Sequence, residues 1–163
     1  MLLLLIRSGK EPEQLGRKMI AMLRDETQHH VWREYTVQFI PDFFNRNFDP
    51  ADLNQADEIL MKGLTEVLWQ MTEETQASLS GTALIKLNDL SQNFSNIDQK
   101  RLREVASQMA TDESIDSASR MGVIRVLTER NSVDQVDAIS QIALNQEAPV
   151  TLRMLAINSA LKL

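Results

Sequence analysis

Residues 103–127 of the chain recur at positions 136–160, so this part of the sequence is an internal repeat with an offset of 33 residues. The identities that carry it are Ser107, Gln108, Ala110, Arg120, Met121 and Ile124, which return as Ser140, Gln141, Ala143, Arg153, Met154 and Ile157. A fixed period of this size is typical of stacked helical pairs, each of which buries its apolar side against its neighbours. The repeat therefore predicts an all-α chain arranged as an α-α superhelix, a right-handed solenoid.

The composition agrees with a helical chain and narrows the kind of partner. The sequence has 5 Gly and 4 Pro among 163 residues, too few for a fold dominated by strands and tight turns. Its net charge of −6 comes mainly from residues 51–100, which hold three basic and eight acidic side chains. Because phosphate binding needs clustered Lys and Arg, we expect a protein partner and no nucleic acid. The absence of Cys excludes disulfides, thiolate catalysis and Cys-based zinc sites.

The N-terminal apolar run from Leu2 to Ile6 is too short for a signal peptide and far too short to span a bilayer. We interpret residues 1–8 as the remnant of a helix. We therefore expect no membrane contact and a cytoplasmic protein. The alternative is that the chain is a fragment of a longer, exported protein.

Capping signals and apolar spacing predict helices along the whole chain. The predicted ranges are 12–25, 29–46, 52–71, 74–92, 98–111, 114–130, 132–145 and 149–162, paired into hairpins at 12–46, 52–92, 98–130 and 132–162 of one domain, 1–163. Asp49-Pro50-Ala51-Asp52 predicts the start of the third helix, and Ser132-Val133-Asp134-Gln135 that of the seventh. Pro41 falls inside the second helix, which it should kink by removing a backbone hydrogen bond.

Apolar stripes and glycines indicate how these helices pack. The stripe of the last helix consists of Val150, Met154, Ile157 and Leu161, and we expect it to be buried. Glycines at four helical positions should each cost about 1 kcal/mol relative to Ala; they are Gly16, Gly63, Gly81 and Gly122. Close approach of neighbouring helices is the simplest compensation for that cost.

Arg33, Arg120 and Arg153 occupy the same place in the first, third and fourth hairpins. We interpret them as donors to the end of a helix in the neighbouring repeat, because the guanidinium fork suits carbonyls and carboxylates. The alternative is a basic stripe along an inner face of the stack.

Eight residues before each of these arginines stands a short polar residue, Asp25, Asp112 or Asn145. We expect its side chain to accept hydrogen bonds from the free N–H groups that open the second helix of the hairpin.

The segments Val31-Trp32-Arg33, Ser119-Arg120-Met121 and Pro149-Val150-Thr151-Leu152-Arg153-Met154-Leu155-Ala156 resemble the HEAT-like (PBS-lyase-type) helical repeat family. The resemblance implies about four HEAT-like hairpins and a non-catalytic scaffold or adaptor that mediates protein–protein interaction. Some members of the family act as lyase-type chaperones for bilin pigments and others as DNA-alkylation glycosylases, so both stay open as alternatives. A purely structural segment of a larger protein is a further alternative.

The residue types that carry catalysis or hold cofactors do not gather into a site. His29 and His30 are adjacent, with Asp25 and Glu34 nearby, but two neighbouring His on a helix point about 100° apart, and we interpret them as polar turn residues. Neither GxGxxG nor GxxxxGK[ST] occurs. We therefore predict no enzyme, no cofactor and no metal.

Exposed residues of the second helices are the candidate partner-binding surface. They are Arg33, Glu34, Arg120, Arg125, Arg153 and Asn158. The two tryptophans, Trp32 and Trp69, we interpret as core or interface residues rather than ligand platforms, with Trp32 a packed anchor.

Overall fold

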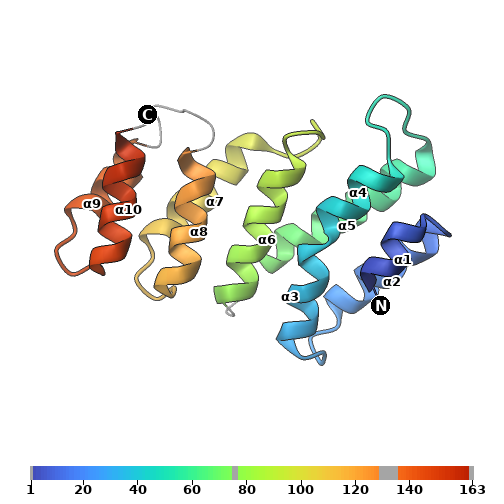
Figure 1. Cartoon of the computed structure of the whole chain (residues 1–163), viewed down its shortest axis with the longest axis horizontal. Helices are drawn as coiled ribbons and strands as arrows, with labels where there is room; N and C mark the ends of the chain where they lie inside the picture. The colour runs from blue at the N-terminus through green and yellow to red at the C-terminus, as the bar shows by residue number, and fades with distance from the viewer. Residues whose placement is uncertain (1, 75–76, 129–135, 162–163) are drawn as a thin grey trace. The chain divides into compact units, whose positions relative to one another are not determined.

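The computed structural model describes residues 2–74, 77–128 and 136–161. All regular structure within these ranges is helical, without a strand, which confirms the prediction of an all-α chain (Figure 1). The chain divides into two compact units, unit 1 at Met1–Ile97 and unit 2 at Asp98–Leu163. The predicted Ser132–Gln135 start signal lies outside the described residues, and the single domain over 1–163 stays a prediction.

Unit 1 is built from helices α1 to α6. Their bounds are Leu2–Ser8, Pro12–Arg24, His30–Gln38, Ile40–Asn47, Gln55–Met71 and Ala77–Leu90. The first helices of the two hairpins, α2 and α5, pack on each other, and α3 packs on α6 in the same way. Helices α5 and α6 pack together as the second hairpin. Helix α1, at Leu2–Ser8, lies within the segment at residues 1–8 that was predicted to be helical, and its Ile6 is completely buried.

The predicted kink at Pro41 is present as a break between two helices. Helix α3 ends at Gln38, α4 begins at Ile40, and Figure 1 shows the bend between them. Pro41 has no N–H, so it cannot bond to the carbonyl of the residue four positions earlier. Beyond the bend, Phe44 is fully buried and its ring meets those of Phe48 at 5.5 Å and Phe94 at 5.3 Å. These aromatic contacts tie α4 to the connection that follows α6.

Helix α5 begins later than the sequence predicted. Its N-cap is Asn54, whose side chain accepts from the N–H groups of Ala56 at 2.9 Å and Asp57 at 3.0 Å, and Asp57 in turn accepts from the Asn54 N–H at 3.3 Å. This reciprocal box satisfies two free helix donors and one loop donor at once. The predicted start at Asp49–Asp52 is wrong, because Asp49 instead accepts from the Ala51 N–H in a separate turn.

Two of the helical glycines mark a close crossing of α2 and α5. A Cβ on Gly16 would lie 2.7 Å from Cδ2 of Leu60, and a Cβ on Gly63 would lie 3.0 Å from Cδ1 of Ile20. Each glycine thus faces a large side chain of the opposite helix. The close approach expected from the sequence is confirmed at these two positions.

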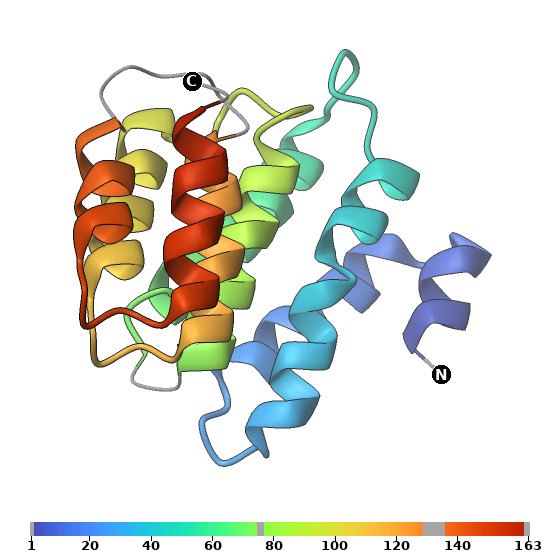
Figure 2. The same ribbon diagram turned by 60° about the vertical axis from the view of Figure 1, so that its left-hand side comes forward.

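Unit 2 consists of α7 (Gln99–Thr111), α8 (Ser117–Thr128), α9 (Val136–Leu144) and α10 (Val150–Ala160). These helices form two hairpins, α7/α8 and α9/α10. The hairpins pack through corresponding helices, since α7 contacts α9 and α8 contacts α10. Figure 2 shows the α9–α10 connection beside the α7–α8 connection. The side chain of Asn145 in one connection donates to Glu113 in the other at 2.8 Å.

The apolar stripe predicted for the last helix faces outward. Val150, Met154, Ile157 and Leu161 are exposed, whereas the buried side chains of α10 are Leu152, Ala156 and Ser159. The expectation that this stripe is buried is wrong. Helix α10 packs on both α8 and α9, and the small side chains of Ala156 and Ser159 suit such close packing.

Candidate functional site

The recurring arginines hold helix ends. The Nε of Arg33 donates to the carbonyl of Leu23 at 3.0 Å, and the Nε of Arg120 donates to the carbonyl of Ala110 at 2.9 Å. Each bond reaches back ten residues, to the end of the first helix of the same hairpin. The sequence predicted an acceptor in the neighbouring repeat. The donor role is confirmed, whereas both carbonyl acceptors lie in the same hairpin, so for these two bonds the predicted acceptor is wrong.

Arg33 also joins the two hairpins of unit 1. Its Nη1 donates to Oε2 of Glu74 at 2.8 Å, and its Nη2 forms a second ion-paired hydrogen bond with Oε1 of the same carboxylate. Glu74 lies in the connection between α5 and α6. Nearby, Glu34 accepts a hydrogen bond from the Thr82 hydroxyl of α6 at 3.1 Å. These contacts fix α3 firmly against the second hairpin.

The six residues predicted to bind a partner differ in their exposure. Arg33 and Arg120 are buried, contrary to the expectation that they are exposed, and Glu34 and Arg153 are half-buried. The Nε of Arg153 is buried without a hydrogen-bond partner in the described part of the chain. Arg125 on α8 and Asn158 on α10 have exposed side chains. A role in partner binding stays a prediction for all six.

The polar residue at each hairpin turn organises its loop. Asp25 accepts from the Thr27 hydroxyl at 2.6 Å and the Thr27 N–H at 3.0 Å, and Asp112 accepts from the Ser114 hydroxyl at 2.7 Å and N–H at 2.9 Å. The donors lie in the loop rather than at the start of the next helix, which corrects the prediction. These hydrogen bonds hold the pKa of Asp25 and the pKa of Asp112 below the ordinary range, and the bond from the hydroxyl has the largest effect in each case.

The helix starts that follow have caps of their own. Asp116 accepts from the N–H groups of Ala118 and Ser119, each at 3.0 Å, and from the Ser119 hydroxyl at 2.7 Å. The hydroxyl bond is the main reason that the pKa of Asp116 is lowered. His29 caps α3, since its Nδ1 accepts from the Val31 N–H at 3.3 Å, and its ring stacks on His30. Within the described ranges, no group of three or more His, Asp or Glu could hold a metal ion.

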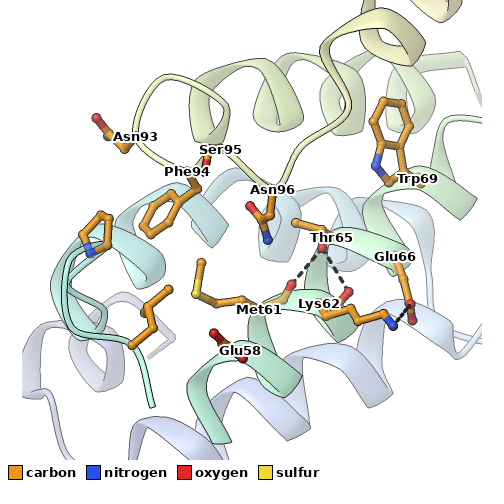
Figure 3. A pocket seen from close by; sticks show the side chains of 12 residues that line it. Glu58, Met61, Lys62, Thr65, Glu66, Trp69, Asn93, Phe94, Ser95 and Asn96 are labelled. Atoms are coloured by element: carbon orange, nitrogen blue, oxygen red, sulfur yellow. Dashed lines mark hydrogen bonds and ion pairs between the residues drawn. The ribbon is translucent and has the colours of Figure 1, made fainter. Parts of the chain in front are cut away.

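An open groove of about 610 Å³ runs beside α5 in unit 1 (Figure 3). Helix α5 forms one wall, and residues of the 48–54 and 91–98 connections form the rest. Its base is apolar, because the side chains of Met61, Trp69 and Phe94 line it and are largely buried in the fold. Nothing in the sequence pattern predicted this groove.

The rims of the groove are polar. Glu58, Lys62 and Glu66 line it from successive turns of α5, and the amide of Asn96 faces them from the 91–98 connection (Figure 3). Lys62 lies 3.9 Å from Glu66, and the exposed fractions of the two side chains are 76% and 51%. Such an exposed pair contributes little to stability, so both charges remain available to a ligand.

Exposed apolar side chains gather on the last helix and on α3. On α3, the exposed fractions are 51% for Val31, 59% for Trp32 and 38% for Tyr35. The Trp32 and Tyr35 rings meet edge to face at 6.4 Å, and Tyr35 meets Phe39 at 4.7 Å. The interpretation of Trp32 as a packed anchor is therefore wrong, and its ring stands on the surface. We call Val31, Trp32 and Tyr35 the α3 face.

No helix in the described ranges is both long and apolar enough to cross a membrane. Comparisons of the chain with protein-family models, curated proteins and solved structures find no match. The resemblance to HEAT-like repeats accordingly stays a prediction.

Proposed function

We propose that this protein is a non-catalytic helical-repeat scaffold or adaptor that binds a protein partner through the α3 face. The exposure of Val31, Trp32 and Tyr35 on one helix carries this proposal. Trp and Tyr are enriched at protein interfaces because they combine a large apolar area with few rotatable bonds and a polar tip. An exposed cluster of such side chains loses unfavourable contact with water when a partner covers it.

The opposite side of α3 makes the α3 face rigid. Arg33, Thr36 and Val37 are buried, and Arg33 is bonded both to Leu23 and to Glu74. The Thr36 hydroxyl donates to the Trp32 carbonyl at 2.9 Å. A helix held in this way presents its outer side chains with little freedom left to lose on binding, which favours affinity.

The proposed architecture is a right-handed α-α superhelix of about four HEAT-like hairpins. Two observations support it. The Arg-to-carbonyl bond recurs with the same ten-residue reach in the first and third hairpins. Like helices also pack on like helices within each unit, α2 on α5 and α3 on α6 in unit 1, and α7 on α9 and α8 on α10 in unit 2. Scaffolds of this kind bind partners along rows of exposed helix residues.

Affinity capture from a lysate of the native organism tests the proposal. The bait proteins are the wild type, a Trp32→Ser/Tyr35→Ser variant, and a control with Gln38→Ala, an exposed position of the same helix. We expect one or more proteins to be captured by the wild type and by the control but lost with the double variant. Circular dichroism checks that each bait is folded. Equal capture by all three folded baits would reject the α3 face as the binding surface.

A further inference from the structure

We infer that the groove beside α5 binds a short extended peptide that carries one large apolar side chain between two basic residues. The groove residues do not overlap the α3 face, so this inference adds a second binding site to the proposed function and stands or falls separately from it. The argument rests on the base of the groove, on its length and on the charges along its rim.

The base of the groove suits an apolar anchor. Met61, Phe94 and Trp69 are 1%, 3% and 9% exposed, so they are fixed in the packed fold and show only a small part of their apolar surface at the bottom of the groove. Pro50 and Leu53, which are more exposed, add to the apolar lining. In Figure 3, Phe94 and Trp69 stand toward opposite ends, with Met61 between them. Met side chains adapt to ligand shape and make favourable contacts with aromatic rings. The volume of about 610 Å³ is within the range of sites for small ligands and short peptide segments.

The length of the groove sets the length of the peptide. From Glu58 to Trp69 helix α5 advances by eleven residues, or about 16 Å at 1.5 Å per residue. An extended chain advances by about 3.3 Å per residue, so roughly five residues span the groove. Alternate side chains of an extended peptide point the same way, and residues 1, 3 and 5 of a pentapeptide therefore face the groove together.

The charges on the rim match basic residues at the ends of that peptide. Glu58 and Glu66 are eight residues apart on α5, which places their backbones about 12 Å apart along the axis. Residues 1 and 5 of an extended peptide are about 13 Å apart. Among the described residues no ion pair involves Glu58, and the Lys62–Glu66 pair is weak because it is exposed. Two Arg side chains can thus reach two carboxylates while residue 3 reaches the apolar base.

The opposite rim can hold the peptide backbone. The side-chain amide of Asn96 points into the groove toward Thr65 in Figure 3, and an amide both donates and accepts hydrogen bonds. On the α5 side, the single Thr65 hydroxyl shares its hydrogen between the carbonyls of Met61 at 2.9 Å and Lys62 at 3.0 Å, which leaves its oxygen as an acceptor. Asn93 is steadied by a hydrogen bond from its amide nitrogen to the side-chain oxygen of Asn45 at 3.2 Å.

Trp69 provides the readout, because the chain has 2 Trp and the other is Trp32. A Trp32→Phe variant of the full chain is titrated with three acetylated and amidated pentapeptides, Arg-Ala-Leu-Ala-Arg, Glu-Ala-Leu-Ala-Glu and Arg-Ala-Ser-Ala-Arg. We expect a saturable change of Trp69 fluorescence with the first peptide alone. Raising the ionic strength should weaken this binding, since the rim charges are exposed to solvent.

A second series in the same background changes the rim. Glu58→Gln/Glu66→Gln should weaken binding of the basic peptide by roughly 2- to 30-fold, as expected for two exposed ion pairs. The matched control is Glu104→Gln, which removes an exposed acid from the Lys100–Glu104 pair of the same spacing and geometry, 3.8 Å against 3.9 Å, and it should bind like the parent.

Several results would overturn the inference. They are the lack of saturable binding of the basic peptide, equal binding of the acidic or the serine peptide, and an unchanged affinity in the rim variant. A Trp69 signal that follows protein concentration without peptide would mean that a second copy of the chain fills the groove. The peptide comparison is decisive by itself if the rim variant does not fold.

Discussion

Replacing Arg33 by Met should destabilise unit 1 strongly, and the structure gives the size of the effect. Met keeps much of the aliphatic stem but removes both the bonds to the Leu23 carbonyl and the ion pair with Glu74. Breaking a buried ion pair costs about 3–5 kcal/mol, and a buried carbonyl left unpaired costs about 1–3 kcal/mol. The Glu74 side chain is 26% exposed and regains hydration, which reduces the first cost. We therefore expect a loss of about 3 kcal/mol in the free energy of unfolding.

Arg120→Met is the natural comparison, because the same side chain occupies the same place in unit 2. Arg120 donates one described hydrogen bond, to the Ala110 carbonyl, rather than a set of bonds to two groups. The expected loss is about 1–2 kcal/mol. The loss in free energy of unfolding for Glu74→Gln should lie between the losses for Arg33→Met and Arg120→Met, since the Leu23 carbonyl keeps its Arg33 donors.

Both tryptophans belong to unit 1, so Trp fluorescence during urea unfolding follows that unit, while circular dichroism follows the whole chain. Arg33→Met should move the fluorescence transition, and in heat the shift should be about 4–8 °C for each kcal/mol. Arg120→Met should move the transition seen by circular dichroism more than that seen by fluorescence. A loss below about 1 kcal/mol for Arg33→Met, or equal losses for Arg33→Met and Arg120→Met, would refute the importance assigned to the Arg33–Glu74 link.

Three further predictions concern local features of the fold. Gly16→Ala should lower the free energy of unfolding by about 1–2 kcal/mol, since overlap with Leu60 exceeds the gain in helix propensity, and a stabilised variant in urea unfolding would contradict the close crossing. Asn54→Ala should cost about 1 kcal/mol and Asp49→Ala less than about 0.5 kcal/mol in the same assay, with the reverse order refuting the position of the cap. The lowered pKa of Asp25 gives stability that is fully present above the ordinary value of 3.8 and is lost as pH falls through the lower folded-state pKa. In Asp25→Asn, the free energy of unfolding should therefore fall less steeply with decreasing pH below about pH 4 than in the wild type. Identical pH profiles of the two proteins would reject that contribution.

The sequence predicted the order and extent of the helices well, because the signals are local. Pro41 marks the α3–α4 break, and Pro12 stands at the first residue of α2. The start of α5 was missed because two polar segments compete to cap it, and the pair Asn54 and Asp57 satisfies more backbone donors than Asp49 does. Recurrence identified Arg33 and Arg120 as hydrogen-bond donors. It did not show that their carbonyl acceptors lie in their own hairpin, while in the described part of the chain only Arg33 also reaches a carboxylate, Glu74, of the next one.

The outward face of α10 and the groove depend on tertiary structure. Helix α10 has apolar residues on more than one side, so periodicity alone favoured the larger stripe of Val150 and Met154, whereas packing on α8 and α9 selected the smaller Ala156 and Ser159. The groove brings α5 together with Asn96 and with the 48–54 connection, which are far apart in sequence and share no motif. Exposure of Trp32 likewise follows from Arg33 taking the buried side of α3.

The hydrogen bonds of Arg33 and Arg120 to a carbonyl ten residues earlier restrict where the chain can tolerate insertions and deletions. Each bond spans a connection of constant length, because the two helices of a hairpin are separated by residues 25–29, 112–116 and 145–149. Adding or removing one residue there would rotate the arginine away from its carbonyl by about 100° on the helix. Among the described residues, no Arg-to-carbonyl bond of this kind crosses the connections between hairpins at 48–54 and 91–98. Insertions and deletions should therefore accumulate between hairpins, and a library of random insertions would recover folded proteins from those two segments while losing them from the five-residue turns.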